Sequence, residues 1–119
     1  MNIIVGHMIG DYLLQSDWMA LNKKKSGMNG LLACVIHCLI WTISVYAFCF
    51  MQTRSVLIFT LLFASHFILD RTNIVKWYCN ITKLMPNPSM WKIILCDNTL
   101  HLLMVYLIAL FFNVRLGWI

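Results

Sequence analysis

The sequence predicts an all-α membrane protein, a compact bundle of four transmembrane helices of which the first is short. Of its 119 residues, 61% are hydrophobic and only 11% are charged, whereas soluble domains are about 45–50% apolar and about 25% charged. This composition excludes a soluble globular protein and a disordered chain. At 13.9 kDa, residues 1–119 have room for one domain. Because a span takes about 20 apolar residues, four spans would use nearly all of the chain.

Four apolar stretches predict the helices, at about residues 2–18, 31–51, 56–78 and 93–112. Helices are expected because open strands cannot span lipid. The first stretch has only about 17 residues, so it either spans the membrane or forms a re-entrant helix. The segment 80–90 holds both prolines, Pro86 and Pro88, and is expected to be a surface loop.

The basic residues predict the orientation of the bundle. Two of them, Arg54 and Arg115, fall on one side of the expected spans. Seven fall on the other side: Lys23, Lys24, Lys25, Arg71, Lys76, Lys83 and Lys92. The positive-inside rule then predicts a multi-pass protein of the inner (cytoplasmic) membrane, with cytoplasmic basic loops and both termini outside. We interpret the net charge of +5 as a topology signal and expect no nucleic-acid partner.

Histidine and aspartate recur at helical spacing. The chain has no Glu, four Asp and four His, and each expected helix holds one His. Three pairs are four residues apart: His7 with Asp11, His66 with Asp70, and Asp97 with His101. Residues at this spacing share one helix face.

The three pairs also agree in depth. Asp11, Asp70 and Asp97 each lie six or seven residues from a tryptophan expected at the basic boundary, Trp18, Trp77 or Trp91. This spacing puts the three carboxylates about 10 Å into the membrane. The order of His and Asp reverses in the last helix because that helix runs in the opposite direction. We therefore expect the pairs to converge, with His37 at the same site.

Such a set predicts a metal centre. Imidazoles and carboxylates that face one another are the ligands of divalent transition metals. The candidate ligands are His7, Asp11, His37, His66, Asp70, Asp97 and His101. Zinc is the first expectation, manganese or iron also fits, and one or two ions can be held. The alternative is that the same side chains hydrogen-bond across helices or relay protons.

Several neighbouring residues have candidate roles. We expect Asp11 and Gln15 to be catalytic, Asp11 as general base and Gln15 in orienting water or substrate. Arg71 and Lys76 either extend to the interface or bind an anionic substrate group. Other residues favour packing: Gly6 and Gly10 would allow close approach of another helix, and Cys34 and Cys38 would pack around His37.

The run His7-Met-Ile-Gly-Asp11-Tyr-Leu-Leu-Gln15-Ser-Asp-Trp18 resembles the opening of a membrane-protein family called domain of unknown function 3307. That family continues with a His in the second helix, H-x-x-x-D in the third and D-Q-x-x-H in the fourth. His37, His66 to Asp70, and Asp97 to His101 match these motifs, except that Asn98 replaces the usual Gln. The resemblance implies a bacterial or phage protein of unassigned function. A more distant similarity to integral-membrane metal-dependent hydrolases is an analogy only.

Three functions compete at this point. The first is a metal-dependent hydrolase or transferase that acts on a membrane lipid or another amphiphile. The second is a metal-ion or proton transporter or channel subunit, because intramembrane Asp and His also mark ion pathways. The third is a structural or signalling subunit in which the polar layer holds helices together. The extensive apolar surface suits self-association into a homo-oligomer. We expect the outer half to be dry, with Phe48, Phe50, Ile58, Phe59, Ile108 and Phe111, which favours the enzyme.

Overall fold

The computed structural model describes residues 3–82 and 89–115, and these residues form helices and no strands. The all-α prediction is confirmed. The expected loop over 80–90 is only partly described: Lys83, Pro86 and Pro88 lie outside the described residues.

Two helices are long and apolar enough to cross a membrane. The first, Met28–Thr53, comprises α3 (Met28–Val45), a π-helical segment Tyr46–Phe50 and a 3₁₀ turn Met51–Thr53. It ends where Arg54 adopts a left-handed conformation, with φ of 48°. The second is α6 (Met90–Phe111), whose 22 residues extend about 33 Å. Both helices are long enough to cross a hydrocarbon layer of about 30 Å.

The third expected span is bent. Instead of one helix over 56–78, the chain forms α4 (Val56–Arg71) and α5 (Ile74–Ile81), at an angle of 66°. Thr72 is extended and cannot continue the helix. Ser55 caps the start of α4 by accepting a hydrogen bond from the Ile58 N–H. If this bent pair is one span, the described residues hold three candidate spans.

The first expected span is shorter than predicted. Residues Ile3–Leu13, which comprise α1 (Ile3–Met8) and a π-helical turn η1 (Ile9–Leu13), extend only about 16 Å. The chain then turns at Ser16 and forms a separate helix, α2 (Asp17–Asn22). The expected single helix over 2–18 is therefore divided, and a fourth span is not confirmed.

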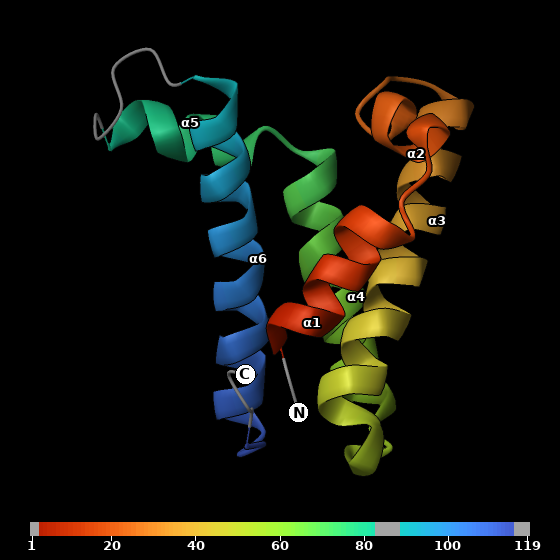
Figure 1. The fold of residues 1–119 in the computed structure, drawn as a ribbon, viewed down its shortest axis with the longest axis vertical. Coiled ribbons are helices and arrows are strands. Elements are labelled where there is room, and N and C mark those ends of the chain that lie inside the picture. The colour runs from red at the N-terminus through yellow and green to blue at the C-terminus, as the bar shows by residue number, and fades with distance from the viewer. Residues whose placement is uncertain (1–2, 83–88, 116–119) are drawn as a thin grey trace.

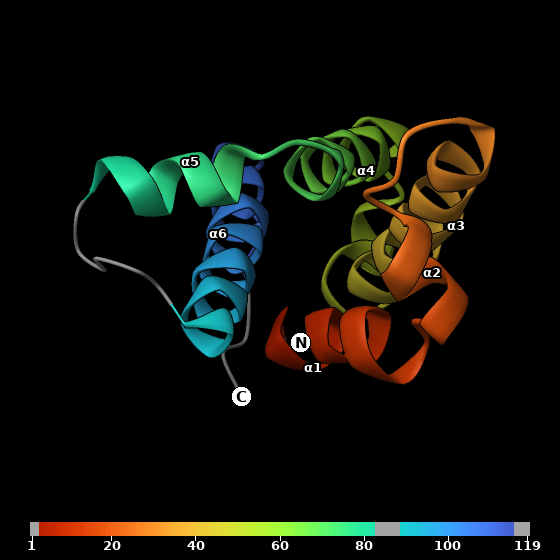
Figure 2. The same ribbon diagram turned by 90° about the horizontal axis from the view of Figure 1, so that it is seen from above.

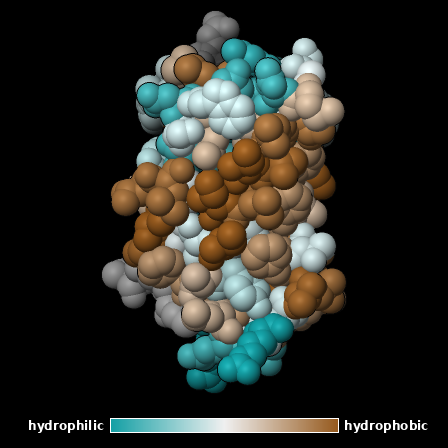
Figure 3. All heavy atoms as spheres, turned by 90° about the vertical axis from the view of Figure 1, so that its right-hand side faces the viewer, coloured by the Kyte–Doolittle hydropathy of each residue, from teal (hydrophilic) through white to brown (hydrophobic). Residues whose placement is uncertain are grey.

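The helices surround a common centre. Figure 2 shows α1 and α4 on opposite sides, with α3 and α6 completing the ring, and α1 and α4 each contact both α3 and α6. In Figure 1, α2, α5 and the start of α6 lie at the upper end, whereas the end of α3 lies at the lower end. The space-filling view shows an apolar belt between two hydrophilic ends (Figure 3), as expected of a protein in a bilayer.

The first helix lies unusually close to α3. A Cβ atom at Gly10 would meet the Trp41 Cα at 2.8 Å, and one at Gly6 would meet the Val45 Cα at 3.1 Å. The expected role of these glycines in close packing is thus realised against α3. This contact brings His7 and Asp11 to the centre of the ring.

The lower part of the bundle is packed mainly with apolar side chains. Its buried cluster consists of Ile3, Trp41, Val45, Cys49, Phe50, Ile58, Leu62, Val105, Ile108 and Ala109. Phe50, Ile58 and Ile108 lie in this core as expected, whereas Phe48 and Phe111 are exposed on the outer surface. Thr42 and Ser44 are buried polar residues in the same region, and Ser44 bonds to its own helix at the Ile40 carbonyl.

Candidate metal centre

The four histidines converge in the interior. His7, His37, His66 and His101 come from four different helices, and each residue is at most 1% exposed. Neighbouring ring centroids are close: His37 and His66 are 5.1 Å apart, and His66 and His101 are 4.4 Å apart. His7 stacks on His101 at 5.9 Å. The expected convergence is therefore present in the fold.

One group of ligand atoms surrounds His37 and His66. Their Nε2 atoms are 3.1 Å apart. Asp70 Oδ2 lies 3.1 Å from the first and 3.6 Å from the second. Asp11 Oδ1 lies 3.3 Å from His37 Nε2 and 3.8 Å from His66 Nε2. These separations bracket the edge of about 3.3 Å between ligands on a tetrahedral ion with bonds of about 2.0–2.1 Å.

The His37 nitrogen has more polar neighbours than it can bond. Within 3.3 Å it faces His66, Asp70, Asp11 and also the Lys23 ammonium, 3.2 Å away. A ring nitrogen offers one proton or one lone pair, so it can satisfy only one of these neighbours at a time. Asp11 Oδ1 has no hydrogen-bond partner among the described residues. This crowding is the arrangement expected where ligand atoms share one cation.

A second group of possible ligands consists of Asp70, Asp97 and His101. His101 Nε2 lies 3.5 Å from Asp70 Oδ1. Asp97 Oδ2 is 3.9 Å from the other ring nitrogen of His101. A third group, Cys38 with His66 and Asp70, adds a thiol that we expected to pack only. The Cys38 Sγ atom lies 3.9 Å from that of Cys34.

His7 belongs to none of these groups. The Trp41 indole N–H donates to His7 Nδ1 at 2.9 Å, so that nitrogen accepts and carries no proton. The proton is therefore on Nε2, which donates to Asn98 Oδ1 at 3.0 Å. Both nitrogens are engaged. The structure thus places six of the seven expected ligands in groups that are compact enough to hold a metal ion. His7 lies beside these groups, with its Nδ1 atom 3.4 Å from Asp11 Oδ2.

Lys23 is the main residue whose place in the site was not predicted from the sequence. It follows α2, and its ammonium forms an ion pair with Asp70 Oδ2 at 2.6 Å. Burial disfavours the charged amine, but the negative charge of Asp70 and the hydrogen bond to it outweigh this effect and raise the pKa of Lys23 above its ordinary value. Lys23 stood in a run of three lysines that we expected on the basic side, and no local pattern distinguished it from Lys24.

Two further residues organise the histidines. Trp41 stacks on His66, with centroids 4.0 Å apart and planes at 16°. Because Trp41 is four residues after His37 on one helix face, its place beside the site could have been predicted. Asn98 bonds to the Tyr12 hydroxyl at 2.6 Å as well as to His7. In the sequence, Asn98 was noted only because it replaces the Gln of the D-Q-x-x-H motif.

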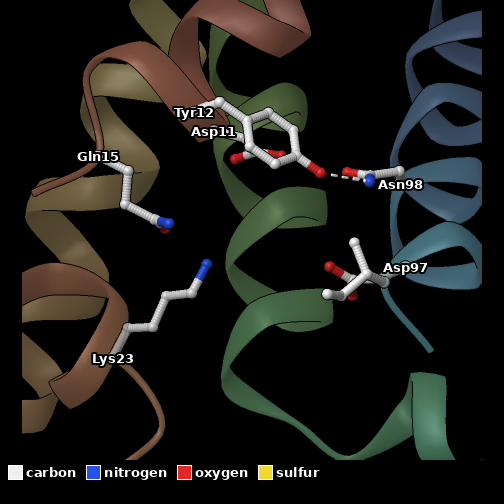
Figure 4. A pocket seen from close by; sticks show the side chains of 7 residues that line it. Asp11, Tyr12, Gln15, Lys23, Asp97 and Asn98 are labelled. Atoms are coloured by element: carbon white, nitrogen blue, oxygen red, sulfur yellow. Dashed lines mark hydrogen bonds between the residues drawn. The ribbon is translucent and has the colours of Figure 1, made fainter. Parts of the chain in front are cut away.

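A pocket of about 200 Å³ opens beside the cluster. It is lined by Asp11, Tyr12, Gln15, Lys23, Ile94, Asp97 and Asn98. Figure 4 shows Lys23 extending toward the space between Gln15 and Asp97. The buried Gln15 Oε1 has no hydrogen-bond partner among the described residues. Asp11 and Asp97 belong to both the pocket and the ligand groups, and Lys23 joins the two because its ammonium pairs with Asp70.

The two expected substrate-binding cations lie elsewhere. Arg71 donates to the carbonyl oxygens of Lys23 and Lys25, at 3.0 and 2.7 Å, and so fixes the segment after α2. Lys76 lines a smaller pocket of about 130 Å³ with Cys79, Asn80 and Ile93, between α5 and α6. Asp17 is exposed in the first turn of α2.

Together the fold and the cluster define a small helical membrane protein with a candidate metal centre in its interior. The chain belongs to a known family: residues 1–118 match the family described as "Protein of unknown function (DUF3307)". The resemblance found in the motifs is thereby confirmed. No curated protein and no solved structure matches the chain.

Proposed function

We propose that the protein is an intramembrane metal-dependent hydrolase that acts on an ester bond of a lipid or another amphiphile. The observation that carries this proposal is the group formed by His37, His66 and Asp70 beside a pocket. Two imidazoles and one carboxylate are a ligand set of catalytic zinc sites, in which water completes the coordination. In this proposal Asp11 acts as the base rather than as a fourth ligand. Manganese or iron would also suit two His and one carboxylate.

The charges of the cluster support a divalent cation. With neutral histidines, Asp11, Asp70 and Asp97 contribute three negative charges and Lys23 contributes one positive charge. The remaining two negative charges are costly because the Asp70 side chain is only 2% exposed and that of Asp11 only 12%. One divalent ion balances them.

The pocket supports a division of roles. A divalent ion held by His37, His66 and Asp70 would make water more acidic and polarise the ester. Asp11 lies beside these residues and lines the pocket, so its carboxylate would take the proton of the water molecule. The water oxygen then bonds to the acyl or phosphoryl centre, the ester bond breaks, and the proton passes to the leaving alcohol. Gln15 and Lys23 line the pocket and would orient the substrate and offset its negative charge.

The location supports a membrane substrate. The site lies between the long apolar helices, near the end that holds α2 and α5 (Figure 1). Six of the seven residues expected on the basic side belong to the described residues and lie in or next to α2, α5 and the first turn of α6. We propose that this end faces the cytoplasm, by the positive-inside rule, in a bacterial inner membrane. Exposed Trp18, Trp77 and Trp91 would mark the interface.

A transporter is the less favoured alternative. It would use the same His and Asp residues but would need a polar path to the opposite end. Beyond Trp41 the described interior is mainly apolar. An enzyme needs access from one side only.

Hydrolysis by purified protein tests the proposal. Detergent-solubilised protein would be incubated with fluorogenic acyl esters and phosphoesters of long-chain alcohols, before and after chelation. We expect turnover that chelation abolishes and Zn²⁺ or Mn²⁺ restores. Asp11→Asn should lower turnover by about 100-fold or more, as for loss of a general base, whereas Asp17→Asn, an exposed matched change, should not. Turnover that is insensitive to chelation and equal in Asp11→Asn would overturn the proposal.

A further inference from the structure

His101 has a buried nitrogen with no hydrogen-bond partner among the described residues. Its Nδ1 atom lies 2.8 Å from the backbone carbonyl oxygen of Asp97. A carbonyl oxygen only accepts, so Nδ1 carries the proton and Nε2 presents its lone pair. Nε2 is unpartnered in a side chain that is 1% exposed. Metal-binding histidines are held in this way, with the other ring N–H donated to a carbonyl or carboxylate.

That lone pair faces a carboxylate rather than a donor. Asp70 Oδ1 lies 3.5 Å from His101 Nε2, and both atoms are electron-rich. Asp97 belongs to the same group, and its Oδ1 atom is also buried without a partner. A cation bound by His101 Nε2, Asp70 Oδ1 and a carboxylate oxygen of Asp97 would give this lone pair a partner and offset the two negative charges. The Lys23 ammonium does not supply it, because its contact is to the other oxygen, Asp70 Oδ2.

Asp70 therefore faces two groups with its two oxygens. Oδ2 lies near His37 and His66, and Oδ1 lies near His101. A carboxylate that shares its oxygens in this way is a natural bridge between two ions, which in two-metal enzymes stand about 3.5–4 Å apart.

We propose that the centre is dinuclear: a second divalent ion binds His101 Nε2, Asp97 and Asp70 Oδ1, and Asp70 bridges it to the first. This inference rests on the proposed function and specifies how many ions its site holds. Two divalent ions exceed the negative charge of the cluster by two. A hydroxide derived from water and an anionic group of the substrate would offset this excess.

Manganese titration tests the second ion. Metal-free protein in detergent would be loaded with Mn²⁺, its content measured, and its electron paramagnetic resonance spectrum recorded. We expect two equivalents in the wild type and a spectrum broadened by coupling between the ions. His101→Leu should retain one equivalent and give the six-line spectrum of an isolated ion. Asp97→Asn provides the same test if His101→Leu does not fold, and Asp17→Asn is the matched control that should keep two equivalents.

The possible results separate the two proposals. One equivalent in the wild type, with the same content in His101→Leu and its loss in His66→Leu, would overturn the dinuclear centre and leave the hydrolase standing. Two equivalents in both His101→Leu and Asp97→Asn would also overturn it. No bound metal in the wild type would contradict the proposed function itself.

Discussion

Lys23 and Asp70 form an ion pair of 2.6 Å between the end of α2 and the interior of the bundle. Asp70 is 2% exposed, and the Lys23 side chain is 15% exposed. The ammonium thus supplies a positive charge where the proposed ion would bind. This pair links the position of a surface helix to the charge of the candidate metal centre.

Removing the ammonium should have opposite effects on the metal-free and metal-bound protein. In the metal-free protein, Lys23→Met leaves the buried Asp70 charge without its partner and should lower the free energy of unfolding by about 3–5 kcal/mol. Metal affinity should rise by about tenfold or more, because a nearby positive charge no longer repels the ion. Thermal unfolding in detergent, with and without Zn²⁺, measures both effects. Lys24→Met, at an exposed lysine, is the control and should change neither. Equal behaviour of the two variants would refute this role of Lys23.

The raised pKa of Lys23 predicts a pH dependence. A group whose pKa is higher in the folded state contributes its full stability below its ordinary value, here 10.5, and loses it as pH rises through the folded-state value. In metal-free protein, the difference in free energy of unfolding between wild type and Lys23→Met should be constant from about pH 7 to 10 and shrink at higher pH. Denaturant titrations at several pH values measure this difference. A difference that disappears by about pH 9 would contradict the buried pair.

His7 should act as a positioning residue rather than as a ligand. Because both of its nitrogens are engaged by Trp41 and Asn98, His7→Gln should retain bound metal at saturation. Its metal affinity should fall by about 10–100-fold, as for other residues that orient ligands. Asn98→Ala should show the same pattern, because it removes the acceptor for His7. Competition with a metal-sensitive dye gives the affinity. Complete loss of metal from His7→Gln, as from His66→Leu, would make His7 a ligand.

The close approach of α1 to α3 should be required for the site. Gly10→Ala introduces a Cβ atom 2.8 Å from the Trp41 backbone and should cost about 1–3 kcal/mol of stability. It should also lower metal binding, because Asp11 is the next residue. Gly27→Ala meets no atom within 4 Å but sits at φ of 88°, so it strains only its own turn. Its metal content should equal that of the wild type, which separates loss of packing at the site from general instability.

Much of the fold and of the candidate site could be predicted from the sequence because the signals are local. Long apolar runs indicated the helices Met28–Thr53, which has no charged residue, and Met90–Phe111. The spacing of four between His66 and Asp70, and between Asp97 and His101, indicated shared faces that the structure brings together. The glycines at 6 and 10 indicated a close helix contact, although not its partner.

The features that could not be predicted depend on tertiary contacts. The break at Ser16 and the bend at Thr72 fall in short polar segments, residues 15–17 and 70–73, inside longer apolar stretches. Polar residues also occur within continuous helices of this chain, so such a segment alone does not show that a helix ends there. Lys23 enters the site because α2 folds back over α3, and its neighbours Lys24 and Lys25 have the same local sequence character but are exposed. His7 lies outside the ligand groups because its Nδ1 atom accepts a hydrogen bond from Trp41, which is 34 residues later in the chain, on α3.

The metal content of the purified protein tests the central claim most directly. Protein would be purified in detergent without chelator from cells grown in medium containing zinc, manganese and iron, and analysed by inductively coupled plasma mass spectrometry beside His66→Leu and Asp17→Asn. We expect one to two equivalents of a divalent transition metal in the wild type and in Asp17→Asn, and marked loss in His66→Leu. Less than about a tenth of an equivalent in the wild type, unchanged after incubation with these ions, would contradict it.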